Sequence, residues 1–206
     1  MAMDREPLLR RALQLSVLSI MLSGVLGGVA VVVGVTSGSL SLLGFGFDAA
    51  IDSAASVALV WRFSIESREP HRAERAETIA EAVVGTVLLV LAVYLAFSAL
   101  RALAEGTHPE ATSVGTALLF VSLAALPPLA LAKHRVAAAL GSRALRADSI
   151  LTGIAALLAL ISLVGLGLTQ LFGLTSADAI GALVVAAVLV REGVASLRAV
   201  RTSDPI

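Results

Sequence analysis

The chain has 206 residues, of which 58% are hydrophobic and only 15% are charged. Soluble domains are about 45–50% apolar and about 25% charged, so the composition excludes a water-soluble globular protein and indicates a membrane protein. The 15 basic and 15 acidic residues cancel and cysteine is absent, so we expect no nucleic-acid partner, no disulfide and no thiolate metal ligand.

Six apolar runs follow one another along the chain. Each approaches or exceeds the roughly 20 residues that a helix needs to cross a bilayer. We therefore predict an all-α polytopic membrane protein, a six-transmembrane-helix bundle that forms one domain over residues 1–206 with no soluble domain. The predicted spans are about 12–35, 41–63, 77–103, 114–132, 147–168 and 177–200.

Two details of the later spans are also predicted. Pro127 and Pro128 lie inside the fourth span, where proline removes a helix hydrogen bond, so we expect a kink or a break. The residues that follow, 133–146, are rich in Lys and Arg and are predicted to form a basic loop.

Lys and Arg are distributed unevenly between the two predicted sides. Nearly all lie in the segments that share a side with the chain termini, whereas Arg101 is the one in a segment on the opposite side. The positive-inside rule then predicts a multi-pass protein of the cell inner membrane with both termini cytoplasmic.

The second predicted span carries two carboxylates, Asp48 and Asp52. Four residues apart, they share one helix face with Cβ atoms about 5–6 Å apart. Each charged carboxylate costs on the order of 2.5–3.5 kcal/mol at the bilayer centre, so protons, a metal cation or a cationic side chain must compensate. Because we expect no Lys or Arg at a comparable depth, the pair predicts a site for a mobile cation or for protons.

Three further acids are candidate metal ligands. Asp148 begins the fifth span, where helix capping explains it as well as metal binding does. Glu81 and Asp178 are weaker candidates. Glu81 lies near the start of the third span, where the helix dipole favours a carboxylate, and Asp178 begins the sixth span, where capping is the simpler interpretation.

An enzyme motif lies close to the same aspartates. Gly44, Asp48 and Asp52 fit the second half of a pattern that resembles the phosphatidyl-transferring enzymes acting on CDP-alcohols. The first half of that pattern, D-G-x2-A-R, is missing, because its fixed positions hold Ala30, Val31, Gly34 and Val35. We expect no enzyme, with a membrane phosphatidyltransferase as a remote alternative.

Four segments together resemble the transmembrane domain of the cation diffusion facilitators, six-helix exporters of zinc and manganese. They are SGSLSLLGFGFDAAIDSAASVAL, HRAERAETIAEAVVGTVLLVLAVYLAFSALRAL, GSRALRADSILTG and SADAIGALVVAAVLVREGVASL. The resemblance implies a homodimer in the lipid bilayer that exports a divalent cation in exchange for protons. Zn²⁺ is the first expectation and Mn²⁺ the next, and no prosthetic group is implied.

Two departures from the exporters limit the resemblance. Their fifth span supplies an H-x3-D pair, and the corresponding positions here are Leu151 and Ala155. The soluble domain that follows their sixth span is not expected here either, which is similar to a short vesicular zinc-transporter-like branch. A site made of carboxylates and water suits hard ions as well as Zn²⁺. The alternative to transport is an inactive relative that acts as a membrane-embedded metal-binding or scaffold protein.

Overall fold

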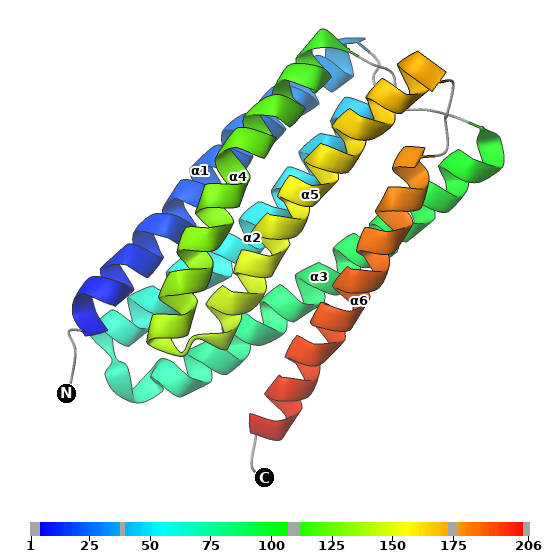
Figure 1. Cartoon of the computed structure of the whole chain (residues 1–206). Helices are drawn as coiled ribbons and strands as arrows, with labels where there is room; N and C mark the ends of the chain where they lie inside the picture. The colour runs from blue at the N-terminus through cyan, green and yellow to red at the C-terminus, as the bar shows by residue number, and fades with distance from the viewer. Residues whose placement is uncertain (1–4, 38–39, 107–111, 173–176, 204–206) are drawn as a thin grey trace.

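The computed structural model describes residues 5–37, 40–106, 112–172 and 177–203, and these residues are almost entirely helical (Figure 1). The elements are α1 (Arg5–Ser37), α2 (Leu40–Arg68), a 3-10 turn (Pro70–Arg72), α3 (Ala73–Glu105), α4 (Ser113–Leu140), α5 (Arg143–Phe172) and α6 (Ala177–Ser203). Six long helices without a strand in the described part confirm the all-α prediction.

Five helices, α1, α3, α4, α5 and α6, are long and apolar enough to cross a membrane. The sixth long helix, α2, has 29 residues and carries Asp48 and Asp52. Large apolar side chains also cover the outside of the bundle, among them Met21, Val93, Phe97 and Phe120. An apolar exterior over helical backbone suits a lipid environment, because every backbone polar group is satisfied within its own helix.

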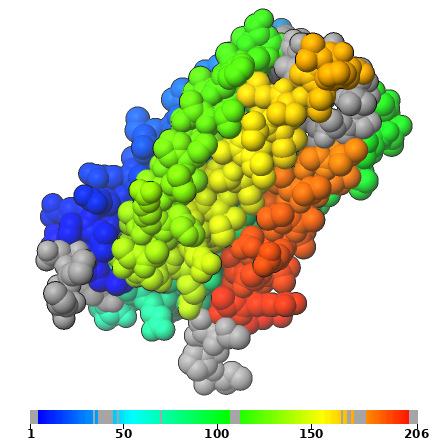
Figure 2. Space-filling view, in the orientation of Figure 1, coloured from blue at the N-terminus to red at the C-terminus, as the bar shows by residue number. Residues whose placement is uncertain are grey.

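The helices form two groups. α1 packs on α2 and α4 packs on α5, while α1 also contacts α4; α3 and α6 form a separate pair that contacts α2 and α5 (Figure 1). The α3–α6 pair packs closely at Gly85 and Gly193, since a Cβ at Gly193 would lie 3.0 Å from the Gly85 carbonyl oxygen. In Figure 2 the atoms of α4, α5 and α6 form a continuous surface on the face turned to the viewer.

The start of α1 and the end of α6 lie at the same end of the bundle, which we call the terminal end (Figure 1). An apolar cluster near this end includes Leu9, Phe63 and Val136, and a smaller cluster toward the opposite end includes Leu26 and Leu118. Along α1 and α4, the stretches between these two clusters contain the buried polar residues described below. The core is therefore interrupted by a polar layer inside the bundle.

The predicted basic loop 133–146 is wrong. α4 continues to Leu140, and only Gly141 and Ser142 separate it from α5. Gly141 has φ 68°, a left-handed conformation that favours glycine and ends the helix. Pro127 and Pro128 lie inside α4 without interrupting it, so there is no break at this point, and the kink that was the other expectation stays a prediction.

Candidate metal-ion site

Seven polar residues from four helices are buried together in the bundle interior. α1 contributes Ser19 and Ser23, α2 contributes Asp52 and Ser56, α4 contributes Lys133, and α5 contributes Asp148 and Thr152. We call this set the buried polar cluster. Its members lie on the inward faces of their helices, as the spacing of four between the pairs on α1, α2 and α5 requires.

Lys133 lies at the centre of the cluster, and its side chain is 0% exposed. Its Nζ lies 2.6 Å from Asp148 Oδ2 and donates hydrogen bonds to Ser19 Oγ at 2.8 Å and Thr152 Oγ1 at 2.9 Å. The expectation that no cationic side chain reaches the depth of the aspartates is wrong. The cause is the length of α4, which carries Lys133 inside the bundle rather than in a loop.

Asp52 shares this environment but has less complete hydrogen bonding. Its side chain is 7% exposed, and its Oδ2 accepts a hydrogen bond from Ser23 at 2.5 Å. Its Oδ1 is buried and accepts no hydrogen bond among the described residues. The carboxylate also lies close enough to Lys133 and Asp148 to interact electrostatically with both. On the next turn of α2, Ser56 Oγ donates to Asp148 Oδ1 at 3.4 Å.

Asp48 lies one turn before Asp52 on α2 and is half-buried. Its Oδ1 is inaccessible and accepts no hydrogen bond within the part of the chain that is described. At this level α1 and α2 approach each other closely, because Gly27 packs against Ala49 and Gly46 packs against Val31. Asp48 and Asp52 thus lie one turn apart on α2, near a close contact with α1. Each has an oxygen, called open below, that accepts no hydrogen bond among the described residues.

The other candidate ligands have different surroundings. Glu81 is buried on α3 and forms an ion pair with Arg143 at 2.7 Å. Asp178 lies in the first turn of α6, and its side chain lies outside the described residues. Leu151, which the resemblance matches to the exporters' His, is buried in the apolar cluster of α3, α5 and α6. Metal binding by these acids stays a prediction.

No group of three or more His, Cys, Asp or Glu side chains suited to a metal ion is present within the described ranges. Asp48, Asp52 and Asp148 are therefore not assembled into a ready three-carboxylate site, and Asp148 is paired with Lys133 instead. A cation bound at Asp48 and Asp52 would complete its coordination from hydroxyls, water or a rearranged Asp148.

The sequence was compared with models of protein families. Residues 16–203 match the family described as the cation efflux transmembrane domain. The chain belongs to the cation efflux family. It is therefore a multi-pass membrane protein of a family that transports metal cations and is not a family of enzymes. The whole buried polar cluster, together with Asp48, lies inside the matched range.

This cation efflux protein also carries a network of ion pairs at its terminal end. Arg62 is buried on α2 and pairs with Glu66 and with Glu77, the latter at 2.5 Å. Glu66 also pairs with Arg5 of α1 at 2.7 Å. Glu77 further accepts hydrogen bonds from Ser142 Oγ and the Ala144 backbone N–H at 2.9 and 2.8 Å. The buried carboxylates of Glu66 and Glu77 thus connect four helices.

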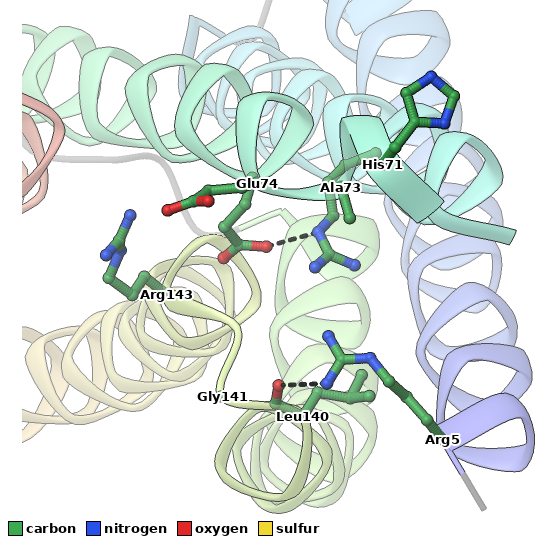
Figure 3. Close-up of a pocket in the computed structure, with 9 residues that line it drawn as sticks. Arg5, His71, Ala73, Glu74, Leu140, Gly141 and Arg143 are labelled. Atoms are coloured by element: carbon green, nitrogen blue, oxygen red, sulfur yellow. Dashed lines mark hydrogen bonds and ion pairs between the residues drawn. The ribbon is translucent and has the colours of Figure 1, made fainter. Parts of the chain in front are cut away.

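A cavity of about 400 Å³ lies within this network. Figure 3 shows Arg5 beside Leu140 and Gly141 of the α4–α5 turn, with Arg143 on the other side of that turn. Arg5 donates to the Leu140 carbonyl oxygen at 3.4 Å. The lining of the cavity includes arginines as well as Glu74 and Glu77. We interpret this region as a structural one, in which the ion pairs hold the helices together at the terminal end.

Sequence reasoning missed Lys133 and Arg62 as buried residues. Arg62 follows Trp61 near the end of an apolar run, a pattern that also fits an interface anchor. The available signal was Glu66, placed four residues later on the same helix face. For Lys133, the signal was the absence of any helix-breaking residue between Lys133 and Gly141.

Proposed function

We propose that this cation efflux protein exports a divalent cation, Zn²⁺ in the first place, by binding it at Asp48 and Asp52 and exchanging it for protons. The observation that supports this most directly is the open Oδ1 of Asp52. A buried charged oxygen without a hydrogen-bond donor is costly, and a cation or a proton removes that cost.

The charges around Asp52 also favour a divalent ion. Asp52 and Asp148 carry two negative charges when ionised, and Lys133 cancels one of them. Asp48 adds another negative charge one turn away. The group as a whole then has an excess of two negative charges, which one divalent cation or two protons neutralise. This equivalence is what an exchange of metal for protons requires.

Weak binding is consistent with the same site. Zn²⁺ prefers four ligands that include nitrogen or sulfur, whereas this site offers carboxylates and hydroxyls, which also suit Mn²⁺. A transported ion must be released on the other side of the membrane. We therefore propose a low-affinity site in which the identity of the ion depends on availability as well as on chemistry.

The arrangement in the membrane follows from the distribution of charge. We propose that residues 1–206 form one six-helix transmembrane domain that acts as a homodimer in the cell inner membrane. We propose that the terminal end, which contains the buried Arg62 and most of the Lys and Arg residues, faces the cytoplasm, as the positive-inside rule predicts.

One observation favours a second candidate, a transport-inactive membrane scaffold. Lys133 already neutralises Asp148 without any metal, as expected of a bundle that no longer moves ions. The two candidates differ in what Asp48 and Asp52 do. In a scaffold these residues contribute to packing alone, whereas in a transporter they bind the ion.

Titration calorimetry distinguishes these candidates. It measures the equilibrium binding of Zn²⁺ and Mn²⁺ to the purified full chain in detergent. We expect wild type to bind Zn²⁺ and the Asp48→Asn, Asp52→Asn double variant to lose that binding while keeping its helical circular dichroism. Glu105→Gln, an exposed acid at the opposite end of α3, is the matched control and should bind as wild type does. Equal binding by all three proteins would refute the proposed site.

A further inference from the structure

The ammonium group of Lys133 has a complete set of oxygen partners. A lysine ammonium has three N–H donors, and the three partners of Nζ are Asp148 Oδ2, Ser19 Oγ and Thr152 Oγ1. The side chain is 0% exposed, so the ammonium group is shielded from bulk water. The Lys133 ammonium, which is part of α4, therefore supplies Asp148 with the positive charge that a bound cation would otherwise supply.

The same arrangement compensates the negative charge of Asp148. One of its oxygens is paired with Lys133, and the other accepts a hydrogen bond from Ser56. Asp52, which lies close to both charged groups, has a donor for one oxygen only. The two neighbouring carboxylates thus differ: Asp148 is held in an ion pair with Lys133, whereas Asp52 forms no ion pair that the structure records and has one oxygen that accepts no hydrogen bond among the described residues.

We propose that Lys133 sets the metal affinity of this transporter by holding Asp148 out of the ion site, so that the cation meets two carboxylates rather than three. The inference rests on the proposed function, in which Asp48 and Asp52 bind the ion. Lys133 is then a positioning residue: it does not touch the transported ion, and it limits how tightly that ion is held.

The physical reason is the number of charged ligands. Sites for hard divalent cations gain affinity with each carboxylate that they offer, and the affinities of natural sites are adjusted through this count. Removing the ammonium leaves Asp148 buried and unpaired beside Asp52, which raises the excess negative charge from two to three. A divalent cation that reaches the site then gains a third carboxylate and is released more slowly.

Zn²⁺ binding to the purified full chain, measured by titration calorimetry, tests this inference. Lys133→Met keeps an unbranched apolar side chain, one atom shorter than that of lysine, and removes the charge. We expect Lys133→Met to bind Zn²⁺ about tenfold more tightly or better, and Lys133→Met with Asp148→Asn to return close to wild type. Arg101→Met, which removes an exposed cation paired with Glu105, is the control and should leave the affinity unchanged.

A purely structural role for Lys133 gives a different result. In that case Lys133→Met lowers the melting temperature but binds Zn²⁺ no more tightly than wild type, which would overturn the inference. If Lys133→Met does not fold, Thr152→Val provides the decision, because it removes one hydrogen-bond partner of the ammonium without removing a charge. We expect Thr152→Val to raise the affinity by a smaller factor, and an unchanged affinity would contradict the inference.

The same titrations distinguish the two proposals. If wild type binds Zn²⁺, the Asp48→Asn, Asp52→Asn variant does not, and Lys133→Met binds no more tightly, the proposed function stands and the role of Lys133 fails. If wild type shows no binding but Lys133→Met gains it, Lys133 does hold Asp148 back, and the proposed two-carboxylate site fails. Absence of binding in every variant refutes both.

Discussion

Lys133 Nζ and Asp148 Oδ2 lie 2.6 Å apart, and neither side chain is exposed. The pair joins α4 to α5, and Ser19 links it to α1. Burying two charges costs solvation energy that their attraction does not always repay, so such a pair is weak evidence for stability alone. Its placement beside Asp52, in a family that transports metal cations, agrees with a role at the proposed ion site.

The first prediction concerns the stability of this pair. Asp148→Asn leaves the ammonium buried without its counter-ion, so we expect a loss of about 3–5 kcal/mol, whereas replacing both partners with uncharged residues is often close to neutral. Lys133→Met with Asp148→Asn should therefore be more stable than Asp148→Asn. Chemical denaturation in mixed detergent micelles measures the difference. A double variant less stable than Asp148→Asn would mean that the two charges do not interact as the geometry indicates.

The second prediction concerns Glu77 at the terminal end. Glu77→Ala removes one of the two carboxylates paired with Arg62 and the acceptor for Ser142 and the Ala144 backbone. Because these groups are buried, we expect a loss of about 3 kcal/mol or more. Glu74→Ala is the matched control: Glu74 is exposed one turn earlier on the same helix, where substitutions usually stay within about 0.5 kcal/mol. Equal melting temperatures for the two variants would contradict the network.

The amino-acid sequence is sufficient for the number and order of the long helices, because apolar runs near the membrane-spanning length dominate it. Their ends were harder to predict. The sequence predicts that α4 stops near residue 132, since Lys133, His134 and Arg135 are typical of a loop. The helix continues because its inward face remains complementary to the bundle: Lys133 meets Asp148, and Val136 and Leu140 join the apolar core.

Only part of the candidate site can be predicted from the sequence. Asp48 and Asp52 were identified because two carboxylates four residues apart are unusual in an apolar run. The partners of Asp52 were not, since Ser23 and Lys133 are distant along the chain and only tertiary packing brings them close. On α1 the spacing of Ser16, Ser19 and Ser23 fits one helix face, and all three are buried. That spacing indicates that α1 contributes polar groups to the interior of the bundle.

The third prediction concerns the contact between α1 and α2 beside Asp48. Gly27→Leu places a side chain where Ala49 already lies, whereas a Cβ at Gly28 meets nothing within 4 Å. Overpacking of a close contact costs about 1–3 kcal/mol. We expect Gly27→Leu to lower both the melting temperature and the Zn²⁺ flux, and Gly28→Leu to behave as wild type. Comparable loss in both variants would exclude close packing at Gly27 as the cause.

The fourth prediction concerns proton exchange. Two neighbouring carboxylates bind protons in coupled steps, so protons and a divalent cation compete for them. Zn²⁺ uptake into proteoliposomes with an acidic lumen should be several-fold faster than uptake into vesicles without a pH gradient. A protonophore that collapses the gradient should remove the difference. Uptake that is indifferent to the imposed gradient would rule out exchange while leaving facilitated transport intact.

The most direct test of the central claim is Zn²⁺ flux into proteoliposomes loaded with a zinc-sensitive dye. It compares wild type with the Asp48→Asn, Asp52→Asn variant and with Glu105→Gln as control. We predict flux for wild type and the control, and flux at the level of empty liposomes for the double variant reconstituted in equal amount. Undiminished flux in the double variant would show that the ion crosses the membrane without these carboxylates, and no flux in wild type with either Zn²⁺ or Mn²⁺ would favour the scaffold.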